Sequence, residues 1–285
     1  MESLNRKDTK IKITTKDFLV TGEPFDLLVD SNRDLLITSP QPSKESLAKY
    51  YESDLYISHT DSNAGIMATV YQAVKQLSII LKLRLILKLN GTPGSLLDVG
   101  CGTGEFLKLA NDNGWNTKGV EPNKGASALA KQKSIEVLET IEMLSGETYD
   151  VITLWHVLEH LPDLEHVTQR IESLLKPGGI LIVAVPNFNS FDAKYYKSYW
   201  AAYDTPRHLW HFSKTAMSKL FSPSLKLVKI KPMLFDAFYV CLLSEKYKKG
   251  TLFSFKALLL GLWSNIAGLR SKEYSSQMYC YKKNL

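Results

Sequence analysis

The chain has 285 residues, of which 45% are hydrophobic and 22% are charged, a composition typical of a folded globular protein and unlike that of disordered or collagen-like chains. Its formal net charge of +6 comes from 35 basic and 29 acidic residues spread along the sequence, so the charge gives no argument for nucleic-acid binding. Cys101, Cys241 and Cys280 lie far apart, which indicates neither a disulfide framework nor a cysteine zinc site.

The first ten residues, MESLNRKDTK, are polar and contain no apolar stretch of the kind found in secretory signals. No later apolar run reaches the length of a membrane span. We therefore expect a cytoplasmic protein, for which contact with a membrane surface stays open.

Residues 1–63 are predicted to form a small β-rich extension. Short apolar runs between Ile11 and Thr38 are separated by turn residues, which indicates a β-meander. Ser43 can cap a short helix that follows. We expect at least one tyrosine of this region to cover the ligand pocket of the main domain: Tyr50, Tyr51 or Tyr56.

Residues 64–285 are predicted to form the main domain, which begins with a long helix between Ala64 and Leu89. After it, β-like runs alternate with helical ones. The β-like runs are Ser95–Val99, Lys118–Glu121, Ile135–Leu138, Val151–Trp155 and Ile180–Val185. This alternation predicts a doubly wound α/β fold, in which a mostly parallel sheet has helices on both faces.

Two more strands are predicted near the C-terminus, at Leu225–Ile230 and Ser276–Lys282, which makes the sheet seven-stranded. Insertions are expected at about 188–212, where aromatic residues crowd, and at about 234–272, before the last strand. Charged residues interrupt the second insertion too often for a bilayer span, so it is predicted to be a helical lid rather than a membrane anchor.

A glycine-rich turn follows the first predicted strand of the main domain. The sequence Asp98-Val99-Gly100-Cys101-Gly102-Thr103-Gly104 lets the backbone approach a ligand without obstruction from Cβ atoms. A dinucleotide-binding turn would have its third glycine at position 105, where this chain has Glu105. Because that carboxylate would meet a pyrophosphate, the turn favours a nucleotide-like ligand of another kind.

An acidic residue ends the second predicted strand, in Gly119-Val120-Glu121-Pro122-Asn123. Glu121 is placed to accept hydrogen bonds from both hydroxyls of a ribose. An acid at a strand end is often only solvated, but the glycine turn before it favours the ribose role.

Two further blocks follow in order, Tyr149–Asp163 and Leu175–Asn187. With the glycine turn and the Glu121 block, they make the stretch from Gly94 to Phe221 resemble class I S-adenosylmethionine-dependent methyltransferases, closest to the ubiquinone-pathway branch. The resemblance implies a Rossmann-like fold and S-adenosylmethionine as the cofactor.

The resemblance also assigns cofactor contacts: the methionine part to Asp98 and the glycine turn, the ribose to Glu121, and the adenine edge to residues 139–141. Trp155 would close over the cofactor, and Cys101 is expected to be a small filler rather than a nucleophile. The residues expected to bind the cofactor are Asp98, Gly100, Cys101, Gly102, Gly104, Glu121, Pro122, Thr140, Ile141 and Trp155.

Histidines and a glutamate follow the fourth predicted strand. If a helical turn begins near Trp155, then His156, Glu159 and His160 share one face, at the strand end where ligands of doubly wound folds bind. Such groups can take a proton from a methyl acceptor. We expect them to converge with His208 in one pocket that faces the cofactor sulfur, as catalytic or orienting residues.

Similar Glu-x-x-Glu-His patterns with a distant histidine bind a divalent cation in ubiquinone-pathway O-methyltransferases and in small-RNA 2′-O-methyltransferases. This chain has His156 in place of the first glutamate, so its donor set suits zinc, iron or manganese better than magnesium. We assign no metal here, and a divalent metal stays open as the less favoured alternative.

The extension also loosely resembles the zinc-ribbon modules of some relatives. The positions where cysteines would be expected hold Val29, Asp30, Asn32 and Asp34. If the module is present, we expect it to have lost its metal.

The resemblance implies a methyltransferase that acts on oxygen or nitrogen of a small-molecule or carrier-linked acceptor; carbon stays open. A subunit that binds S-adenosylmethionine without catalysis, or that stimulates another methyltransferase, is the alternative. A nicotinamide-dependent oxidoreductase is disfavoured by Glu105 and by the turn Lys176-Pro177-Gly178-Gly179. Nucleic acid is not an expected partner, and the sequence does not determine the acceptor or the oligomeric state.

Overall fold

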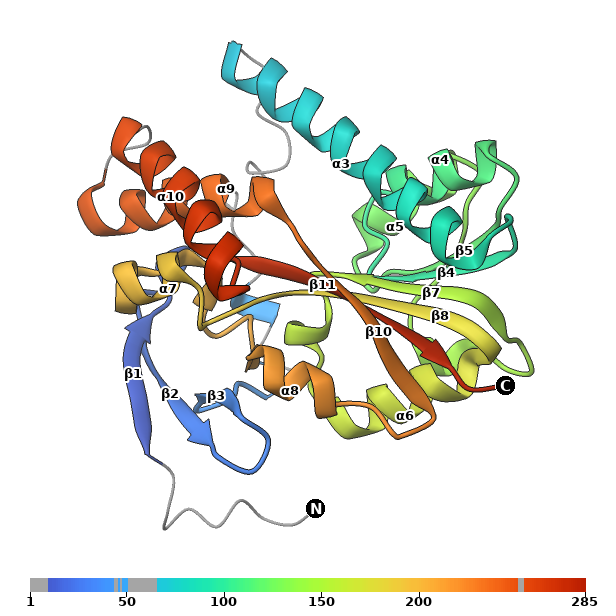
Figure 1. Cartoon of the computed structure of the whole chain (residues 1–285), viewed down its shortest axis with the longest axis horizontal. Coiled ribbons are helices and arrows are strands. Elements are labelled where there is room, and N and C mark those ends of the chain that lie inside the picture. The colour runs from blue at the N-terminus through green and yellow to red at the C-terminus, as the bar shows by residue number, and fades with distance from the viewer. Residues whose placement is uncertain (1–9, 44–45, 47, 51–65, 251–253) are drawn as a thin grey trace.

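The computed structural model describes residues 10–43, 46, 48–50, 66–250 and 254–285. Its centre is a twisted seven-stranded sheet with helices on both sides (Figure 1). The strands are β4 (Ser95–Val99), β5 (Asn116–Val120), β6 (Glu136–Leu138), β7 (Tyr149–Trp155), β8 (Leu175–Pro186), β10 (Leu225–Pro232) and β11 (Ser276–Lys283).

The strand order is β10-β11-β8-β7-β4-β5-β6. Neighbours from β6 to β8 pair in parallel, whereas β11 runs antiparallel to both β8 and β10. This arrangement confirms the predicted doubly wound, mostly parallel sheet. It brings the carboxyl ends of β4, β5 and β7 to one edge, where the glycine turn, Glu121 and His156 follow.

Two layers of helices bury the sheet. The helices are α3 (Ile66–Asn90), α4 (Glu105–Asp112), α5 (Lys124–Gln132), α6 (Leu164–Leu174), α7 (Phe191–Tyr196), α8 (Lys214–Lys219), α9 (Leu234–Lys249) and α10 (Phe255–Ser271). Single 3₁₀ turns are η1 (Ala48–Tyr50), η2 (Ile141–Met143), η3 (Leu158–His160), η4 (Lys197–Tyr199) and η5 (Ala201–Tyr203). Among the described residues, no helix has both the length and the apolar character needed to cross a membrane.

Alternate residues of the central strands face the two layers. Leu96 and Ile182 pack with residues of α3, α4 and α5, and Leu97 and Val183 pack with residues of α6 and α8. All four side chains are completely buried. Burial on both faces explains why these strands read as continuous apolar runs.

A second, antiparallel sheet has the order β1-β2-β3-β9. The meander predicted for residues 11–38 supplies β1 (Ile11–Lys16), β2 (Pro24–Asp30) and β3 (Leu35–Ser39). The fourth strand, β9 (Trp210–Phe212), comes from the 188–212 insertion and pairs Trp210 with Ile37. The proposed boundary at residue 63 stays a prediction, and the sheet joins segments from both sides of it.

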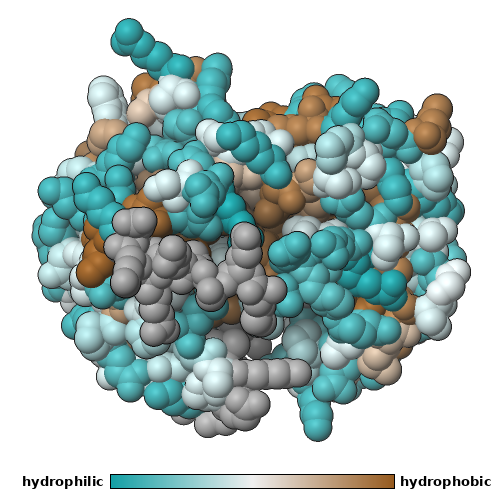
Figure 2. All heavy atoms as spheres, turned by 90° about the horizontal axis from the view of Figure 1, so that it is seen from below, coloured by the Kyte–Doolittle hydropathy of each residue, from teal (hydrophilic) through white to brown (hydrophobic). Residues whose placement is uncertain are grey.

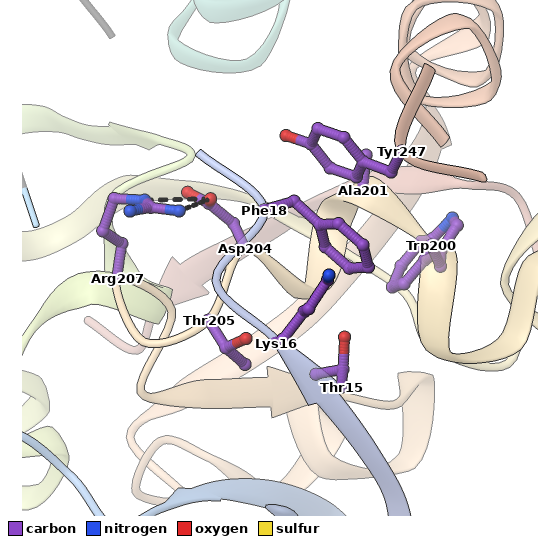
Figure 3. Close-up of a pocket in the computed structure, with 9 residues that line it drawn as sticks. All are labelled: Thr15, Lys16, Phe18, Trp200, Ala201, Asp204, Thr205, Arg207 and Tyr247. Carbon is purple, nitrogen blue, oxygen red and sulfur yellow. Dashed lines mark hydrogen bonds and ion pairs between the residues drawn. The ribbon is translucent and has the colours of Figure 1, made fainter. Parts of the chain in front are cut away.

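Arg207 fixes this junction through buried ion pairs, of which Figure 3 shows the one with Asp204. The Nη2 atom of Arg207 lies 3.0 Å from Asp17 Oδ1 and 2.6 Å from Asp204 Oδ1, and the arginine side chain is 1% exposed. The cavity beside it, with Phe18 and Tyr247 on its wall, measures about 10 Å³. A space of that size holds about one water molecule.

Candidate functional site

The glycine turn has the backbone that its sequence predicts. Gly100, Gly102 and Gly104 have φ angles of 73°, 55° and 76°, in the left-handed region that favours glycine. A Cβ atom at Gly100 would lie 2.3 Å from Val157 Cγ2. The backbone N–H of Gly100 donates to Val120 O at 2.7 Å, so the turn is fastened to the neighbouring strand.

Glu121 braces the same turn. Its Oε2 accepts the N–H of Gly102 at 2.9 Å, and its Oε1 accepts the N–H of Asn123 at 2.9 Å. A pocket of about 200 Å³ opens beside it, lined by Glu121, Pro122, Lys124, Ser127, Ala128, Lys131 and Glu139. Glu121, Pro122 and Glu139 thus border one hollow, as the expected ribose and adenine contacts require.

Two other expected adenine contacts follow β6. Thr140 precedes the η2 turn, which begins at Ile141. The side chain of Ile141 is 7% exposed and packs in the core beneath the sheet. The side chain of Thr140 is exposed, and the adenine contact expected of residues 139–141 stays a prediction.

Asp98 is buried at the end of β4, with 2% of its surface exposed, and accepts a hydrogen bond from Thr153 Oγ1 at 2.6 Å. Burial raises the pKa of Asp98 to about 7, although the Thr153 hydroxyl and the Lys82 ammonium favour its ionised form. Trp155 packs edge-on against Phe106, with ring centres 5.7 Å apart. Its indole Nε1 is buried without a hydrogen-bond partner among the described residues.

Lys82 of α3 also reaches this site, and the sequence analysis missed it. Its Nζ lies 4.4 Å from the centre of the Trp155 ring. Burial lowers the pKa of Lys82, against the attraction of Asp98 and Asp236. A signal was available, because Ile79 and Ile86 at i−3 and i+4 are buried and place Lys82 on the inner face of α3.

Cys101 is 8% exposed and lies where a Cβ on Gly119 would come within 2.5 Å of its Sγ. Burial raises the pKa of its thiol to about 12, so the thiol stays protonated. This agrees with the expected role as a filler inside the turn.

The helical turn predicted from Trp155 is wrong. His156 has a φ of 58°, which interrupts a right-handed helix, and only Leu158–His160 forms a 3₁₀ turn. The backbone N–H of His156 instead donates to Ala184 O of β8 at 3.0 Å. A backbone hydrogen bond to the neighbouring strand therefore overrides the helical spacing of the side chains.

His156 lies between two carboxylates. Its Nδ1 is 3.3 Å from Glu159 Oε1, and its Nε2 is 2.9 Å from Asp236 Oδ2 of α9. Burial acts to lower the pKa of His156, but the two carboxylates outweigh it and raise the pKa to about 10. The imidazole is therefore protonated at neutral pH, so His156 donates hydrogen bonds here rather than acting as a base.

A cluster of three side chains lies next to His156. It consists of Glu159, His160 and His208. One ligand atom of each lies within 4.8 Å of those of the other two. The Nδ1 atoms of His160 and His208 face the carbonyls of Arg207 and Ala202, at 3.0 and 2.9 Å. Glu159 is completely buried, and its Oε2 has no hydrogen-bond partner among the described residues.

The four residues expected in one pocket, His156, Glu159, His160 and His208, thus do not all lie in one cluster. Three form a cluster, while His156 touches it only through Glu159 and turns its other nitrogen to Asp236. Imidazoles that donate Nδ1–H to backbone carbonyls present Nε2 to a partner, as metal-binding histidines do. Within the described ranges, this cluster is the one group whose donor atoms could hold a metal ion.

Two expectations concern the N-terminal extension: that a tyrosine covers the ligand pocket, and that a zinc-ribbon module has lost its metal. The hydroxyl of Tyr50 donates to Glu23 at 2.6 Å and its ring packs on Phe25, both within the extension, and the expected cover of the pocket stays a prediction. Tyr51 and Tyr56 lie outside the described residues. Asp30, at one expected cysteine position, accepts the backbone N–H groups of the turn that follows it.

Comparison with known families adds an independent finding. A family model described as a methyltransferase domain matches residues 71–223, more than half of the chain. The chain is 34% identical over 115 residues to a ubiquinone biosynthesis O-methyltransferase of Haemophilus ducreyi, over 35% of this chain and 49% of that protein. It is 33% identical over 121 residues to the protein of the same name from Vibrio cholerae, over 38% and 49%. The chain spans about half the length of the curated relatives it matches.

Two solved structures share the fold. One is the mycolic acid cyclopropane synthase CmaA1 complexed with SAH and CTAB, with a TM-score of 0.50 and 17% identity over 72% of this chain and 84% of that one. The other is the cyclopropane synthase MmaA2 from Mycobacterium tuberculosis, with a TM-score of 0.50 and 15% identity over the same shares. At such identities the likeness concerns the fold alone.

Proposed function

The chain belongs to the methyltransferase domain family, and from this premise we propose that it transfers a methyl group from S-adenosylmethionine to oxygen or nitrogen of a small-molecule or carrier-linked acceptor. The observation that carries the proposal is the glycine turn braced by Glu121. It combines a backbone open to a ligand with a carboxylate set for a ribose. The curated relatives named above are O-methyltransferases, and the CmaA1 structure contains S-adenosylhomocysteine (SAH).

The charges of the site fit an amino-acid end of the cofactor. Asp98 and Lys82 place a carboxyl group and an ammonium group at the end of β4. A methionine end carries an ammonium and a carboxylate, the complements of these two groups. We assign the carboxylate to Lys82 and the ammonium to Asp98, while the indole of Trp155 packs beside them.

The cofactor supplies an electrophilic methyl group on a sulfonium sulfur. The acceptor must be aligned with the methyl–sulfur bond, and a hydroxyl or amine acceptor must give up its proton as the methyl–oxygen or methyl–nitrogen bond forms. His160 is partly exposed, and burial with the neighbouring His208 lowers its pKa to about 4, so its imidazole is neutral at neutral pH and is our candidate to accept that proton. Glu159 is completely buried and positions the histidines around it.

Cofactor binding is tested by calorimetry. We expect S-adenosylhomocysteine to bind with a Kd on the order of micromolar, about −8 kcal/mol. Glu121→Ala should weaken this binding by about 1 to 3 kcal/mol, because charged hydrogen bonds are lost. Glu136→Ala, which removes an exposed partner of Lys118, is the matched control and should bind normally. Full-strength binding by Glu121→Ala would contradict the ribose assignment.

Catalysis is tested separately, by transfer of labelled methyl from S-adenosylmethionine to catechol, phenol and amine acceptors. Transfer that His160→Ala abolishes while cofactor binding persists would support the proposal. Binding without transfer to any acceptor would favour the non-catalytic alternative. Parallel assays with a chelator and elemental analysis decide whether Glu159, His160 and His208 act through a metal.

A further inference from the structure

Helix α10 exposes its large apolar residues and buries its small ones. The residues it packs inward, against α9 and Tyr274, are small: Ala257, Gly261, Ser264 and Gly268. Those that face outward are exposed by 45% to 68%: Phe255, Leu259, Leu262, Trp263, Ile266 and Leu269. In a helix that only covers a core, this distribution would be reversed. We call these six residues the α10 stripe.

Basic residues border the α10 stripe. Lys248 and Lys249 end α9, Lys256 begins α10 and Arg270 ends it, and all four are exposed. Helix α10 itself contains no acidic residue. The two acidic residues of α9 are engaged: Asp236 with His156 and the buried Glu245 with Lys249. The outward charge of the hairpin is therefore positive.

We propose that the α10 stripe docks on an anionic lipid bilayer. Phe, Leu and Trp side chains on one face of a helix insert at the boundary between headgroups and acyl chains, and flanking lysines and arginines contact anionic headgroups. The helix lies in the plane of the membrane surface and does not span it. Helices α9 and α10 stand at the upper left of Figure 1, whereas the face seen from below in Figure 2 is mostly hydrophilic.

Charge favours a bilayer over a second copy of the chain. A two-fold dimer through the α10 stripe would bring identical patches together, and each patch carries basic residues at both ends. Like charges would then face each other across the interface. An anionic membrane surface complements the same charges.

The stripe is continuous with the acceptor side of the site. Asn265 of α10 donates to Leu234 O at the start of α9, and Asp236 in that first turn bonds His156. Leu234, Phe235 and Tyr239 of α9 are 47%, 39% and 44% exposed. Docking would thus place the His156 side of the site beside the bilayer, which favours an amphiphilic acceptor dissolved in it. This last step alone rests on the proposed function.

Vesicle co-sedimentation tests the docking. We expect the full chain to sediment with vesicles of phosphatidylcholine and phosphatidylglycerol, and much less with phosphatidylcholine alone. Leu262→Asn with Ile266→Asn should weaken the partition on the order of tenfold, because exposed apolar area is lost. Lys248→Glu with Arg270→Glu should abolish the preference for the anionic vesicles. Val228→Asn, at a residue 50% exposed on the edge strand β10, is the control and should bind as the unaltered chain does.

Tryptophan fluorescence gives a local reading. Trp263 is 56% exposed, whereas Trp115, Trp200 and Trp210 are exposed by less than a tenth. Anionic vesicles should shift the emission to the blue, and Trp263→Phe should remove most of the shift while sedimentation persists. This outcome assigns the contact to α10 rather than to another apolar surface.

Three outcomes would overturn the proposal. One is no binding to anionic vesicles, and another is equal binding by every variant. The third is a dimer in gel filtration that the Leu262→Asn, Ile266→Asn variant dissociates, which would make the face an interface between copies. Calorimetry with S-adenosylhomocysteine on the same variants shows that they are folded, and it separates failed docking from failure of the proposed function.

Discussion

At the scale of single residues, the site is organised by charges that neighbouring groups balance. Glu121 accepts hydrogen bonds from two backbone N–H groups, and His156 lies between two carboxylates. Lys82 differs, because among the described residues its ammonium has no hydrogen-bonding partner and rests on the Trp155 ring. Asp98 and Asp236 attract this ammonium without bonding it, so a ligand that supplies a hydrogen-bonded anion would stabilise it further. We therefore expect Lys82 to bind the carboxylate of the cofactor.

Replacing Lys82 by methionine keeps the length of the side chain and removes its charge. If Lys82 binds the carboxylate of the methionine end, Lys82→Met should weaken S-adenosylhomocysteine binding by about 10- to 100-fold, the value of a charge-assisted hydrogen bond. Binding of 5′-methylthioadenosine, which lacks the amino-acid end, should not change. Calorimetry with both ligands measures the difference.

The exposed Lys88 on the same helix provides the control, since Lys88→Met should leave both affinities intact. Equal weakening of both ligands by Lys82→Met would mean that Lys82 shapes the pocket rather than binding the carboxylate. That result would leave the ribose assignment of Glu121 untouched.

At the scale of elements, the turn between β4 and α4 depends on glycine for two separate reasons. Gly100 and Gly102 both have positive φ angles, but only a Cβ at Gly100 would collide with a neighbour, Val157. Nothing lies within 4 Å of a Cβ built at Gly102. The two positions therefore separate backbone strain from steric overlap.

The comparison of Gly100→Ala with Gly102→Ala is our prediction at this scale. Gly102→Ala should lower the free energy of unfolding by about 1 to 2 kcal/mol, the cost of a left-handed alanine. Gly100→Ala should cost about 1 to 3 kcal/mol more, because overpacking is added. Urea denaturation measures both, and Val157→Ala in the Gly100→Ala background should recover part of the loss. Equal losses at the two positions would show that Val157 moves aside freely.

At the scale of the whole molecule, the N-terminal sheet and the 188–212 insertion are one assembly. Strand β3 pairs with β9, and Arg207 ties Asp17, at the end of β1, to the segment that carries His208. Burial opposes ionisation of Asp17, but backbone N–H groups and the Arg207 guanidinium outweigh it and lower its pKa. The extension therefore supports the site, and Thr38 Oγ1 of β3 donates to the backbone carbonyl of His208 at 2.6 Å.

Asp17→Asn should reduce the free energy of unfolding by about 3 to 5 kcal/mol at neutral pH, because Arg207 keeps its burial and loses a charged partner. The folded pKa of Asp17 lies below its model-peptide value of 3.8, so its contribution is complete above pH 3.8 and is lost as the pH falls through the folded pKa. The difference in the free energy of unfolding between the unaltered chain and Asp17→Asn should become smaller as the pH falls over that range. Asp26→Asn, at a half-buried residue that bonds Thr14, should show neither effect. A pH-independent gap in urea denaturation would argue against the charge as the cause.

The sequence by itself determined the sheet, the helices and the backbone of the glycine turn, because these follow from local patterns. Apolar runs between helical segments are buried strands, and Gly100 to Gly104 can take backbone angles that other residues resist. Only the tertiary structure decided the surroundings of His156 and the place of Lys82. The backbone of His156 bonds Ala184 instead of continuing a helix. Asp236, which bonds His156, belongs to the second insertion. Lys82, which lies over the Trp155 ring, belongs to a helix that precedes every motif. Each of these contacts joins residues distant in sequence, and the packing of separate elements, rather than any local spacing, brings them together.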